Sequence, residues 1–423
     1  MSTAGRFWHP FADMAQVAGN ELVIERGDGA TVWDADGNEY FDGTASLWCV
    51  NAGHGRAEIG EAVAGQMGRL ATYQTFSAFS NEPADELCDR LAGYGEAVMD
   101  GPKVFLNLGG GDAIETAAKL ARRYFEAAGE PGRSHIIGRT QGYHGTHGLG
   151  TAIGGIEANQ AGMGPLDPDT THVPWDSLEA LEAEFQRVGP ERVAAVFAEP
   201  VIGAGGVHRV PPNYLQGLAE LCRSSGALFI ADCVIAAFGR LGTWWGVDRF
   251  DLRPDMITFA KGVTSGYLPL GGVLVSERVA APFWEGGGVW FRHGQTYSGH
   301  PTCCAAALAN LDIIEREGLL ERGRAMEDDL AEALAPLGSH ALVGEVRSGV
   351  GALAAVALSR EALDARPALP LELFAQARDR GVLVRPLGDA VALSPPLVAT
   401  REQIEGAAAA IGESLDAIAA TAA

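Results

Sequence analysis

The sequence has 423 residues, which is enough for about two or three domains. Hydrophobic residues make up 47% of the chain and charged residues 20%, as is usual for a soluble globular protein. The formal net charge is −23, from 31 basic and 54 acidic side chains. So acidic a surface repels phosphate backbones, which argues against a nucleic-acid-binding protein.

No apolar run approaches the roughly 18 residues needed to cross a bilayer. Residues 1–10 lack the basic and apolar regions of a signal peptide, so we expect a cytoplasmic protein without membrane contact. The six cysteines show no CxxC spacing and no paired Cys/His pattern. We therefore expect reduced structural thiols and no metal site.

The N-terminal part predicts a small antiparallel sheet. Residues 21–26, 31–34 and 39–42 alternate like short strands, with GDG and ADG as turns between them. Trp48 and His54 follow in loop-like sequence. On their own they are interpreted as a packing aromatic and a local hydrogen-bonding group.

Two helices are predicted next, over residues 56–72 and 83–93. The segment TYQTFSAFSNEP between them is aromatic and polar without a regular period. It predicts a loop at an interface or on the wall of a cleft.

From residue 103 onward the pattern alternates between strand and helix. A strand over residues 104–108 precedes the glycines 109–111 and Asp112, and a strongly amphipathic helix follows over residues 113–129. Glycines that open a helix expose backbone N–H groups at its positive end, which suits a phosphate. The turn is not a P-loop and does not fit GxGxxG, and on its own it is weak evidence.

A strand over residues 134–137 leads into QGYHGTHGLGT, where Tyr143 and His144 stand among glycines. A flat ligand can reach an aromatic ring in such a setting, but glycine-flanked aromatics also occur in plain turns. The residues alone leave both interpretations open.

A helix over residues 178–188 and a strand over residues 192–198 follow, and the strand ends in Glu199. Residues 212–224 predict another helix. This alternation favours a mostly parallel sheet covered by helices on both faces.

Two further apolar runs, residues 228–231 and 256–260, each end in a charged side chain, Asp232 and Lys261. In an open α/β sheet the chemistry lies beyond the carboxyl ends of the strands, where this carboxylate and this amine would meet. A lysine in an apolar setting can attack a carbonyl carbon. The pair suits pyridoxal 5'-phosphate (PLP) chemistry; the alternative is a buried ion pair between two strands.

After a strand over residues 272–275, a loop runs into a long helix that ends near residue 314, and residues 324–337 predict another. Alternating segments near residues 342–346, 352–358 and 382–393 suggest a terminal α+β domain, closed by a helix from Arg401. Arg385 lies beside one of these strands. It would either clamp a carboxylate through its planar fork or pair on the surface.

Taken together, these segments resemble the class III PLP-dependent aminotransferases, and especially the ω-aminotransferase branch that uses pyruvate as amino acceptor. The resemblance spans nearly the whole chain, from HPFAD at His9 to SPPL at Ser394. It implies an α/β protein of PLP fold type I, whose large domain has a mostly parallel seven-stranded sheet between helices. The large domain is expected over residues 51–310, and a small α+β domain from residues 1–50 and 311–423.

The resemblance also assigns roles around the cofactor. Lys261 in FAKG matches the Schiff-base lysine, which also moves a proton, and Asp232 matches the acid that pairs with the pyridine nitrogen. Val234 and Tyr143 match the residues on the two faces of the ring. Glu199 in AEPV matches a carboxylate behind the cofactor.

Four more residues belong to this expected cofactor site. Gly110 and Gly111 match the phosphate turn, and His144 accompanies Tyr143 in GYHG. Thr296 in QTYSGHP matches a threonine that reaches the phosphate of the neighbouring subunit. The resemblance therefore implies a homodimer with shared active sites, or a tetramer built from it.

For the substrate, Phe11, Trp48 and Phe76 resemble the aromatic lining of the ω-aminotransferase pocket, and Arg385 matches the mobile arginine that binds the acceptor's carboxylate. The implied reaction is a ping-pong transfer of an amino group from a primary amine or ω-amino acid to pyruvate or another 2-oxo acid. A decarboxylase or aminomutase on the same scaffold, or a non-catalytic homologue that has lost PLP, are the alternatives.

The chain departs from the family pattern at two places. Cys233 follows Asp232 where the family often has glutamate, which removes a neighbouring charge. The phosphate turn usually reads Ser-Gly-Ser, but residues 109–111 are all glycine. Two hydroxyl donors are thus missing, at about 1.5 to 3 kcal/mol each for a hydrogen bond to a charged group. We expect weaker PLP binding than is typical unless nearby donors compensate.

Overall fold

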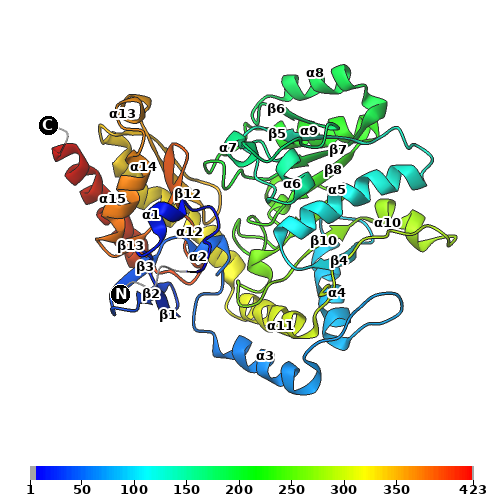
Figure 1. The fold of residues 1–423 in the computed structure, drawn as a ribbon, viewed down its shortest axis with the longest axis horizontal. Coiled ribbons are helices and arrows are strands. Elements are labelled where there is room, and N and C mark those ends of the chain that lie inside the picture. Colours follow the sequence, from blue (N-terminus) through cyan, green and yellow to red (C-terminus); the bar gives the residue numbers. More distant parts are fainter. Residues whose placement is uncertain (1–5, 422–423) are drawn as a thin grey trace.

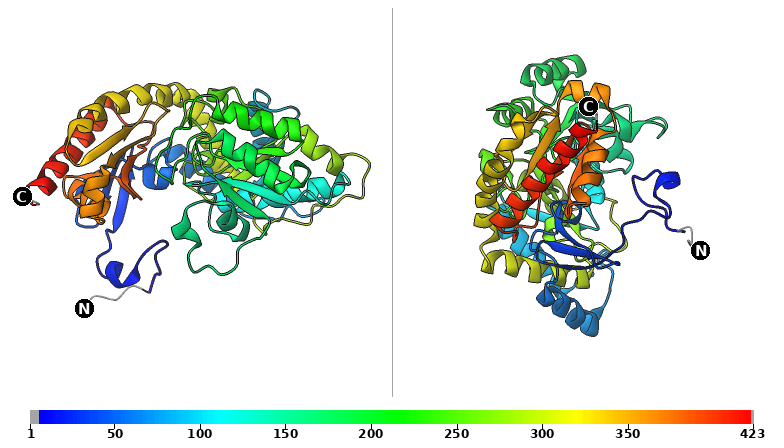
Figure 2. Two further views of the ribbon diagram at one scale, coloured as in Figure 1. Left: turned by 90° about the horizontal axis from the view of Figure 1, so that it is seen from above. Right: turned by 90° about the vertical axis from the view of Figure 1, so that its left-hand side faces the viewer.

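The computed structural model describes residues 6–421. Figure 1 shows two parts: a large sheet with its helices, from the middle of the chain, and a second part that contains both ends of the chain. The N-terminal segment that carries α1 projects away from both parts (Figure 2).

The helices longer than six residues are α3 (Ala57–Leu70), α4 (Glu82–Gly95), α5 (Gly110–Ala127), α8 (Leu178–Val188), α9 (Tyr214–Ser225), α10 (Glu277–Trp284), α11 (Pro301–Arg316), α12 (Leu319–Leu334), α14 (Leu369–Arg378) and α15 (Arg401–Ala420). The shorter ones are α1 (Met14–Val17), α2 (Ala45–Trp48), α6 (Gly148–Ile153), α7 (Glu157–Gln160) and α13 (Arg360–Ala365), and the 3-10 turns are η1 (Pro190–Arg192), η2 (Val247–Phe250), η3 (Lys261–Val263) and η4 (Ala335–Ser339).

The large sheet has seven strands in the order β4-β10-β9-β8-β7-β5-β6. Their bounds are β4 (Lys103–Asn107), β5 (His135–Arg139), β6 (Thr170–Val173), β7 (Val193–Ala198), β8 (Leu228–Asp232), β9 (Met256–Phe259) and β10 (Gly271–Val275). Only β10 runs antiparallel to its neighbours β4 and β9, and the other pairs are parallel. The predicted mostly parallel sheet is confirmed.

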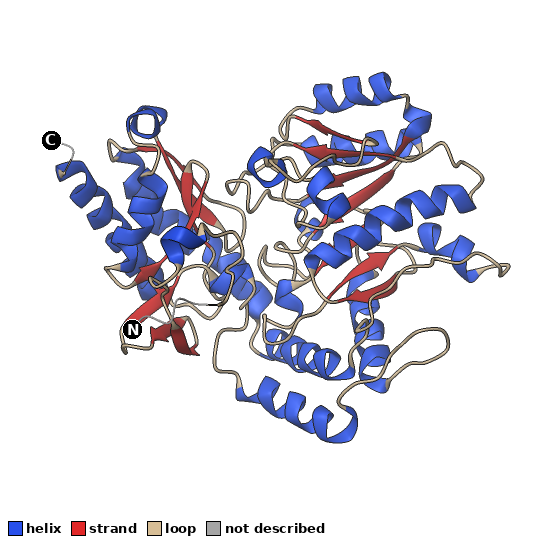
Figure 3. Cartoon of the chain, in the orientation of Figure 1, coloured by secondary structure: helices blue, strands red, loops and turns tan. Residues whose placement is uncertain are grey.

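Helices cover both faces of this sheet (Figure 3). Strand β8 shows why, because its side chains alternate between two apolar clusters. Leu228 and Ile230 pack in the cluster that contains α5, whereas Phe229 and Ala231 pack in the one that contains α9 and α4. A strand buried on both faces has no polar side, so it appears in the sequence as one continuous apolar run.

The second part contains two four-stranded sheets, ordered β1-β2-β3-β13 and β11-β12-β15-β14. Their strands are β1 (Ile24–Asp28), β2 (Thr31–Asp34), β3 (Glu39–Asp42), β11 (Val343–Arg347), β12 (Ala354–Leu358), β13 (Val382–Leu383), β14 (Arg385–Leu387) and β15 (Ala390–Leu393). Strand β13 pairs with β3 across more than three hundred residues of sequence. Both ends of the chain therefore build one α+β part, as predicted, while the exact domain boundaries stay a prediction.

Several elements differ from those predicted. Helix α5 begins at Gly110 rather than at residue 113, so two of the three glycines lie in its first turn. Helix α12 begins at Leu319, after a left-handed Gly318, rather than at residue 324. Strand β6 and helices α10, α13 and α14 were not predicted, since none of them has a long periodic pattern.

Arg240 joins the two parts of the molecule. Its side chain is fully buried and donates hydrogen bonds to the carbonyl oxygens of Ala352, at 3.2 Å, and Pro395, at 2.6 Å. It also donates to Asn51 Oδ1 at 2.6 Å. Burial lowers the pKa of Arg240 to about 10, and these acceptors offset the cost of burying its charge.

We expect Arg240→Met to lower the free energy of unfolding by about 3 kcal/mol or more, because it leaves three buried acceptors without their donor. Urea unfolding followed by fluorescence measures the change. The control is Arg360→Met, whose side chain is 88% exposed and should change stability by about 0.5 kcal/mol or less. Equal midpoints for the two variants would show that Arg240 does not hold the parts together.

Candidate active site

Three charged residues lie at the carboxyl edge of the large sheet. Glu199 follows β7, Asp232 ends β8, and Lys261 comes two residues after β9. The three strands are adjacent and parallel, with Ala198 paired to Ala231 and Asp232 paired to Thr258. The strand pairing therefore gathers all three side chains at one edge, where ligands of open α/β sheets bind.

Asp232 is buried and held by three donors from different elements. His144 Nδ1 lies 2.7 Å from its Oδ2, and Thr258 Oγ1 donates to its Oδ1 at 3.1 Å. The backbone N–H of Val234 also donates to Oδ1, at 3.0 Å. The orientation of the carboxylate is therefore fixed before any ligand binds.

Lys261 begins the turn η3 with a φ of 48°, a left-handed conformation that costs energy in a residue other than glycine. Its Nζ lies 5.9 Å from the centre of the Trp48 ring. Among the residues that the structure describes, Nζ has no hydrogen-bond or ion-pair partner. Burial lowers the pKa of Lys261, against the opposing effect of the Asp232 charge.

Glu199 supports the neighbouring loop. Its buried carboxylate accepts hydrogen bonds from the backbone N–H groups of Tyr143, at 3.0 Å, and Gly203, at 2.9 Å. Burial raises the pKa of Glu199. The buried Arg139 donates a hydrogen bond to the backbone carbonyl oxygen of Glu199 at 2.6 Å.

Tyr143 connects this cluster to Arg385. Burial, together with the Asp232 charge, raises the pKa of the half-buried Tyr143, and the Arg385 charge opposes the rise. Arg385 begins β14, and within residues 6–421 its guanidinium forms no ion pair and no hydrogen bond. An unpaired, partly exposed arginine thus lies near the aromatic ring.

The glycine turn opens α5 beside Val234. A Cβ on Gly110 would lie only 2.9 Å from Val234 Cγ1, whereas one on Gly109 would meet nothing within 4 Å. The first backbone N–H groups of a helix have no partner within it. This turn therefore presents free donors at the positive end of α5, where an anion is favoured.

The structure brings together most, but not all, of the predicted site residues. Trp48 is buried beside Lys261. Phe11 is 68% exposed in the segment before α1, and Phe76 is 51% exposed. Phe76 lines a surface cavity of about 720 Å³ together with Phe79 and Trp290.

Thr296 is exposed in the turn before α11. Its neighbour Gln295 accepts a hydrogen bond from Asn107 Nδ2 at 2.8 Å. In the described part of the chain, no hydrogen bond joins Thr296 to the cluster around Lys261.

Sequence reasoning missed two residues of this cluster, Thr258 and Arg139. Thr258 is the only polar residue of the otherwise apolar strand β9 and pairs with Asp232. A single polar residue within a buried apolar run was therefore a usable signal in the sequence. Arg139 ends a buried strand, and nothing in the sequence distinguishes it from a surface arginine.

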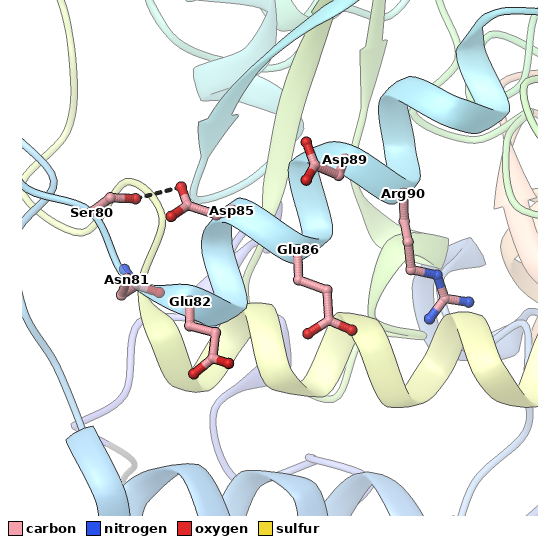
Figure 4. A pocket seen from close by; sticks show the side chains of 7 residues that line it. All are labelled: Ser80, Asn81, Glu82, Asp85, Glu86, Asp89 and Arg90. Atoms are coloured by element: carbon pink, nitrogen blue, oxygen red, sulfur yellow. Dashed lines mark hydrogen bonds between the residues drawn. The ribbon is translucent and has the colours of Figure 1, made fainter.

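Another hollow, of about 770 Å³, follows the outer face of α4 and is lined by Ser80, Asn81, Glu82, Asp85, Glu86, Asp89 and Arg90 (Figure 4). It contains none of the residues at the carboxyl edge of the sheet and is a separate feature. Among residues 6–421, no three His, Cys, Asp or Glu side chains gather as metal ligands. No helix in this range has the length and apolar character of a membrane span.

Comparison with known proteins identifies the family. The model of "Aminotransferase class-III" matches residues 14–415. A putrescine–pyruvate aminotransferase of Pseudomonas aeruginosa is 36% identical, over 94% of this chain and 91% of its own. A probable aminotransferase of Mycobacterium tuberculosis is 40% identical, over 77% of this chain and 72% of its own.

Solved structures agree with this. An amine transaminase from an uncultivated Pseudomonas species, in its PLP-bound form, superposes with a TM-score of 0.93 at 38% identity, over 99% of this chain and 100% of that one. An (S)-enantioselective ω-transaminase from Thermomicrobium roseum gives a TM-score of 0.92 at 37% identity, over 97% and 96% of the two chains. The predicted PLP fold type I is thereby confirmed, and the chain belongs to the class III aminotransferases, which depend on PLP.

Proposed function

We propose that this aminotransferase moves an amino group from a primary amine or ω-amino acid to pyruvate or a related 2-oxo acid, in a ping-pong reaction. One observation carries the proposal: a lysine with a lowered pKa and an arginine, neither of which has a side-chain partner within residues 6–421, lie near a fixed aspartate and Tyr143. The pyruvate-dependent relative from P. aeruginosa supports the choice of acceptor.

The residues at the sheet edge fit PLP. Three hydrogen bonds to Asp232 leave room for one more donor, a protonated pyridine nitrogen. We propose that Val234 beside the glycine turn and Tyr143 on the adjacent loop enclose the ring, and the N–H groups of Gly110 and Gly111 suit its phosphate. When bound, PLP supplies an electron sink for charge that develops at the substrate's Cα.

Lys261 has two tasks in this proposal: it holds the aldehyde, and it moves a proton to and from the substrate's Cα. Both tasks require a neutral amine for part of the cycle. Burial favours the neutral form, and no carboxylate forms an ion pair with Nζ in residues 6–421. Asp232 affects Lys261 only through its charge, because its hydrogen bonds go to His144, Val234 and Thr258.

Arg385 is proposed to bind the carboxylate of the 2-oxo acid through its planar fork. One pocket has to accept an apolar amine and a carboxylate in turn. The absence of an ion-pair partner within residues 6–421 leaves Arg385 available to the acceptor without breaking an internal bond. Trp48 supplies an apolar wall near Lys261 for the amine, and we propose that Phe11 and Phe76 line the pocket in the assembled enzyme.

We also propose a homodimer with shared active sites. The exposed large hydrophobic side chains include Met67, Leu70, Tyr73, Phe76, Phe79, Trp284, Trp290 and Tyr297. Phe76, Phe79 and Trp290 line one surface cavity, and Tyr73 packs edge-on against Phe79. Exposed apolar side chains that lie together are typical of an interface. Thr296 stands in the same region and would serve the phosphate of the partner subunit.

We expect a panel of amines and ω-amino acids, each offered with pyruvate, to yield alanine with at least one donor. Lys261→Ala should abolish both alanine formation and the visible absorbance of the lysine–PLP chromophore, because no other residue in the cluster supplies an amine. Amino-acid analysis and absorbance spectra measure the two outcomes. Alanine formed by Lys261→Ala, or carbon dioxide in place of alanine from the wild type, would contradict the proposal.

The lowered pKa of Lys261 has a consequence for cofactor uptake. A lower pKa increases the neutral fraction of the amine at any pH below its ordinary value of 10.5. We expect the rate of PLP capture by the apo-enzyme to rise with pH and to level off below pH 10.5, as stopped-flow absorbance would record. N-acetyl-lysine amide is the control, and its rate should keep rising to about pH 10.4. Superimposable pH profiles for the enzyme and the control would show that the site does not lower the pKa of Lys261.

Arg385→Ala should raise the KM for pyruvate by about 10- to 100-fold, because it removes a charge-assisted bond worth about 1.5 to 3 kcal/mol. The half-reaction with a carboxylate-free amine should change by less than about threefold. Steady-state and single-turnover kinetics separate the two effects, with Arg360→Ala as the control. Equal losses in both half-reactions would rule out that Arg385 binds the carboxylate of the acceptor.

A further inference from the structure

The glycine turn of this chain has no side chain with which to hold a phosphate. Gly109 and Gly111 stand where the family pattern has serine hydroxyls, so only backbone N–H groups remain. The structure shows what lies beside Gly111 in place of a hydroxyl. A Cβ built on Gly111 would lie 3.3 Å from both Cε1 and Nε2 of His147.

His147 is free to act at this turn. Its backbone precedes α6, but its side chain caps no helix and is 49% exposed. Its Nδ1 lies 3.6 Å from Oδ1 of Asp112 in the first turn of α5. This contact turns the opposite nitrogen, Nε2, toward Gly111, and no described residue accepts a hydrogen bond from it.

The charges around the ring favour an anion at Nε2. With Asp112 on one side and an anion on the other, both ring nitrogens face acceptors, and only the protonated imidazole donates from both. A ring in that form would also offset the charge of Asp112, which would otherwise repel a phosphate at the start of α5.

We propose that His147 is a cofactor-binding residue whose Nε2–H replaces the missing serine hydroxyl at position 111. The inference rests on the assignment of the glycine turn to the phosphate of PLP. It also accounts for glycine at position 111, since a Cβ there would lie 3.3 Å from the imidazole ring, closer than ordinary contact, and the ring would have to shift.

The test is an equilibrium titration of the apo-enzyme with PLP and, separately, with pyridoxal, which has no phosphate. The visible chromophore at Lys261 reports binding of both. His147→Ala should raise the Kd of PLP by about 10- to 100-fold and leave that of pyridoxal within about twofold. His147→Gln, which retains an N–H donor, should fall between wild type and His147→Ala. His340→Ala, in the small domain, is the matched control and should change neither Kd.

A rescue distinguishes a phosphate contact from a general effect on the fold. Adding Gly111→Ser to His147→Ala should restore most of the PLP affinity, because the missing ring leaves room for the hydroxyl. Gly111→Ser alone should not tighten binding, since its Cβ meets the ring. Thermal melting of each apo-variant shows whether the fold is retained.

Three outcomes would overturn the inference. These are an unchanged PLP Kd in His147→Ala, an equal loss for PLP and pyridoxal, or a double variant that binds no better than His147→Ala. A wild-type protein that forms no chromophore with PLP would instead remove the proposed function, and this inference with it.

Discussion

The register between β8 and β9 is the constraint on which the site depends. It places Asp232 opposite Thr258, so that a hydroxyl from one strand holds a carboxylate from the next. A slip of one residue would turn each side chain to the other face of the sheet. Such a slip would exchange Leu228 and Ile230 with Phe229 and Ala231 between two closely packed clusters, so the fit of these side chains opposes it and core packing fixes the geometry of a polar site.

The site also depends on the buried charged groups around Asp232. Two carboxylates, Glu199 and Asp232, are buried within one cluster, and their mutual repulsion contributes to the raised pKa of Glu199. Arg139 and His144 supply compensating groups. Arg139 reaches the Glu199 backbone rather than its carboxylate, which leaves one carboxylate oxygen for the backbone N–H of Tyr143 and the other for that of Gly203. The Glu199 carboxylate therefore helps to fix the position of the loop that carries Tyr143.

Much of this architecture could be predicted from the sequence because local patterns determine it. The apolar runs that end in Asp232 and Lys261 indicated both the strands and the edge at which they meet. Helix α5 was predicted from its periodicity, but its start was not, since glycine has a low intrinsic helix propensity and tertiary packing overrides it.

Contacts between distant segments are what the sequence could not indicate. Arg240 resembles any other arginine until the fold brings Asn51 and Pro395 to it. His147 likewise acquires a neighbour at Gly111 only when α5 and α6 are packed together. The roles of Phe11, Phe76 and Thr296 stay predictions, because they concern surfaces that a second subunit would cover.

The close approach of Gly110 to Val234 has a wider consequence. This one contact sets the spacing between the turn that we propose for the phosphate and the side chain that we propose for the ring face, so it would match the site to one length of ligand. Any larger residue at position 110 would push the two apart and change that length. Directed evolution of this enzyme should therefore find position 110 closed, while position 109, with open space around it, stays available for new side chains.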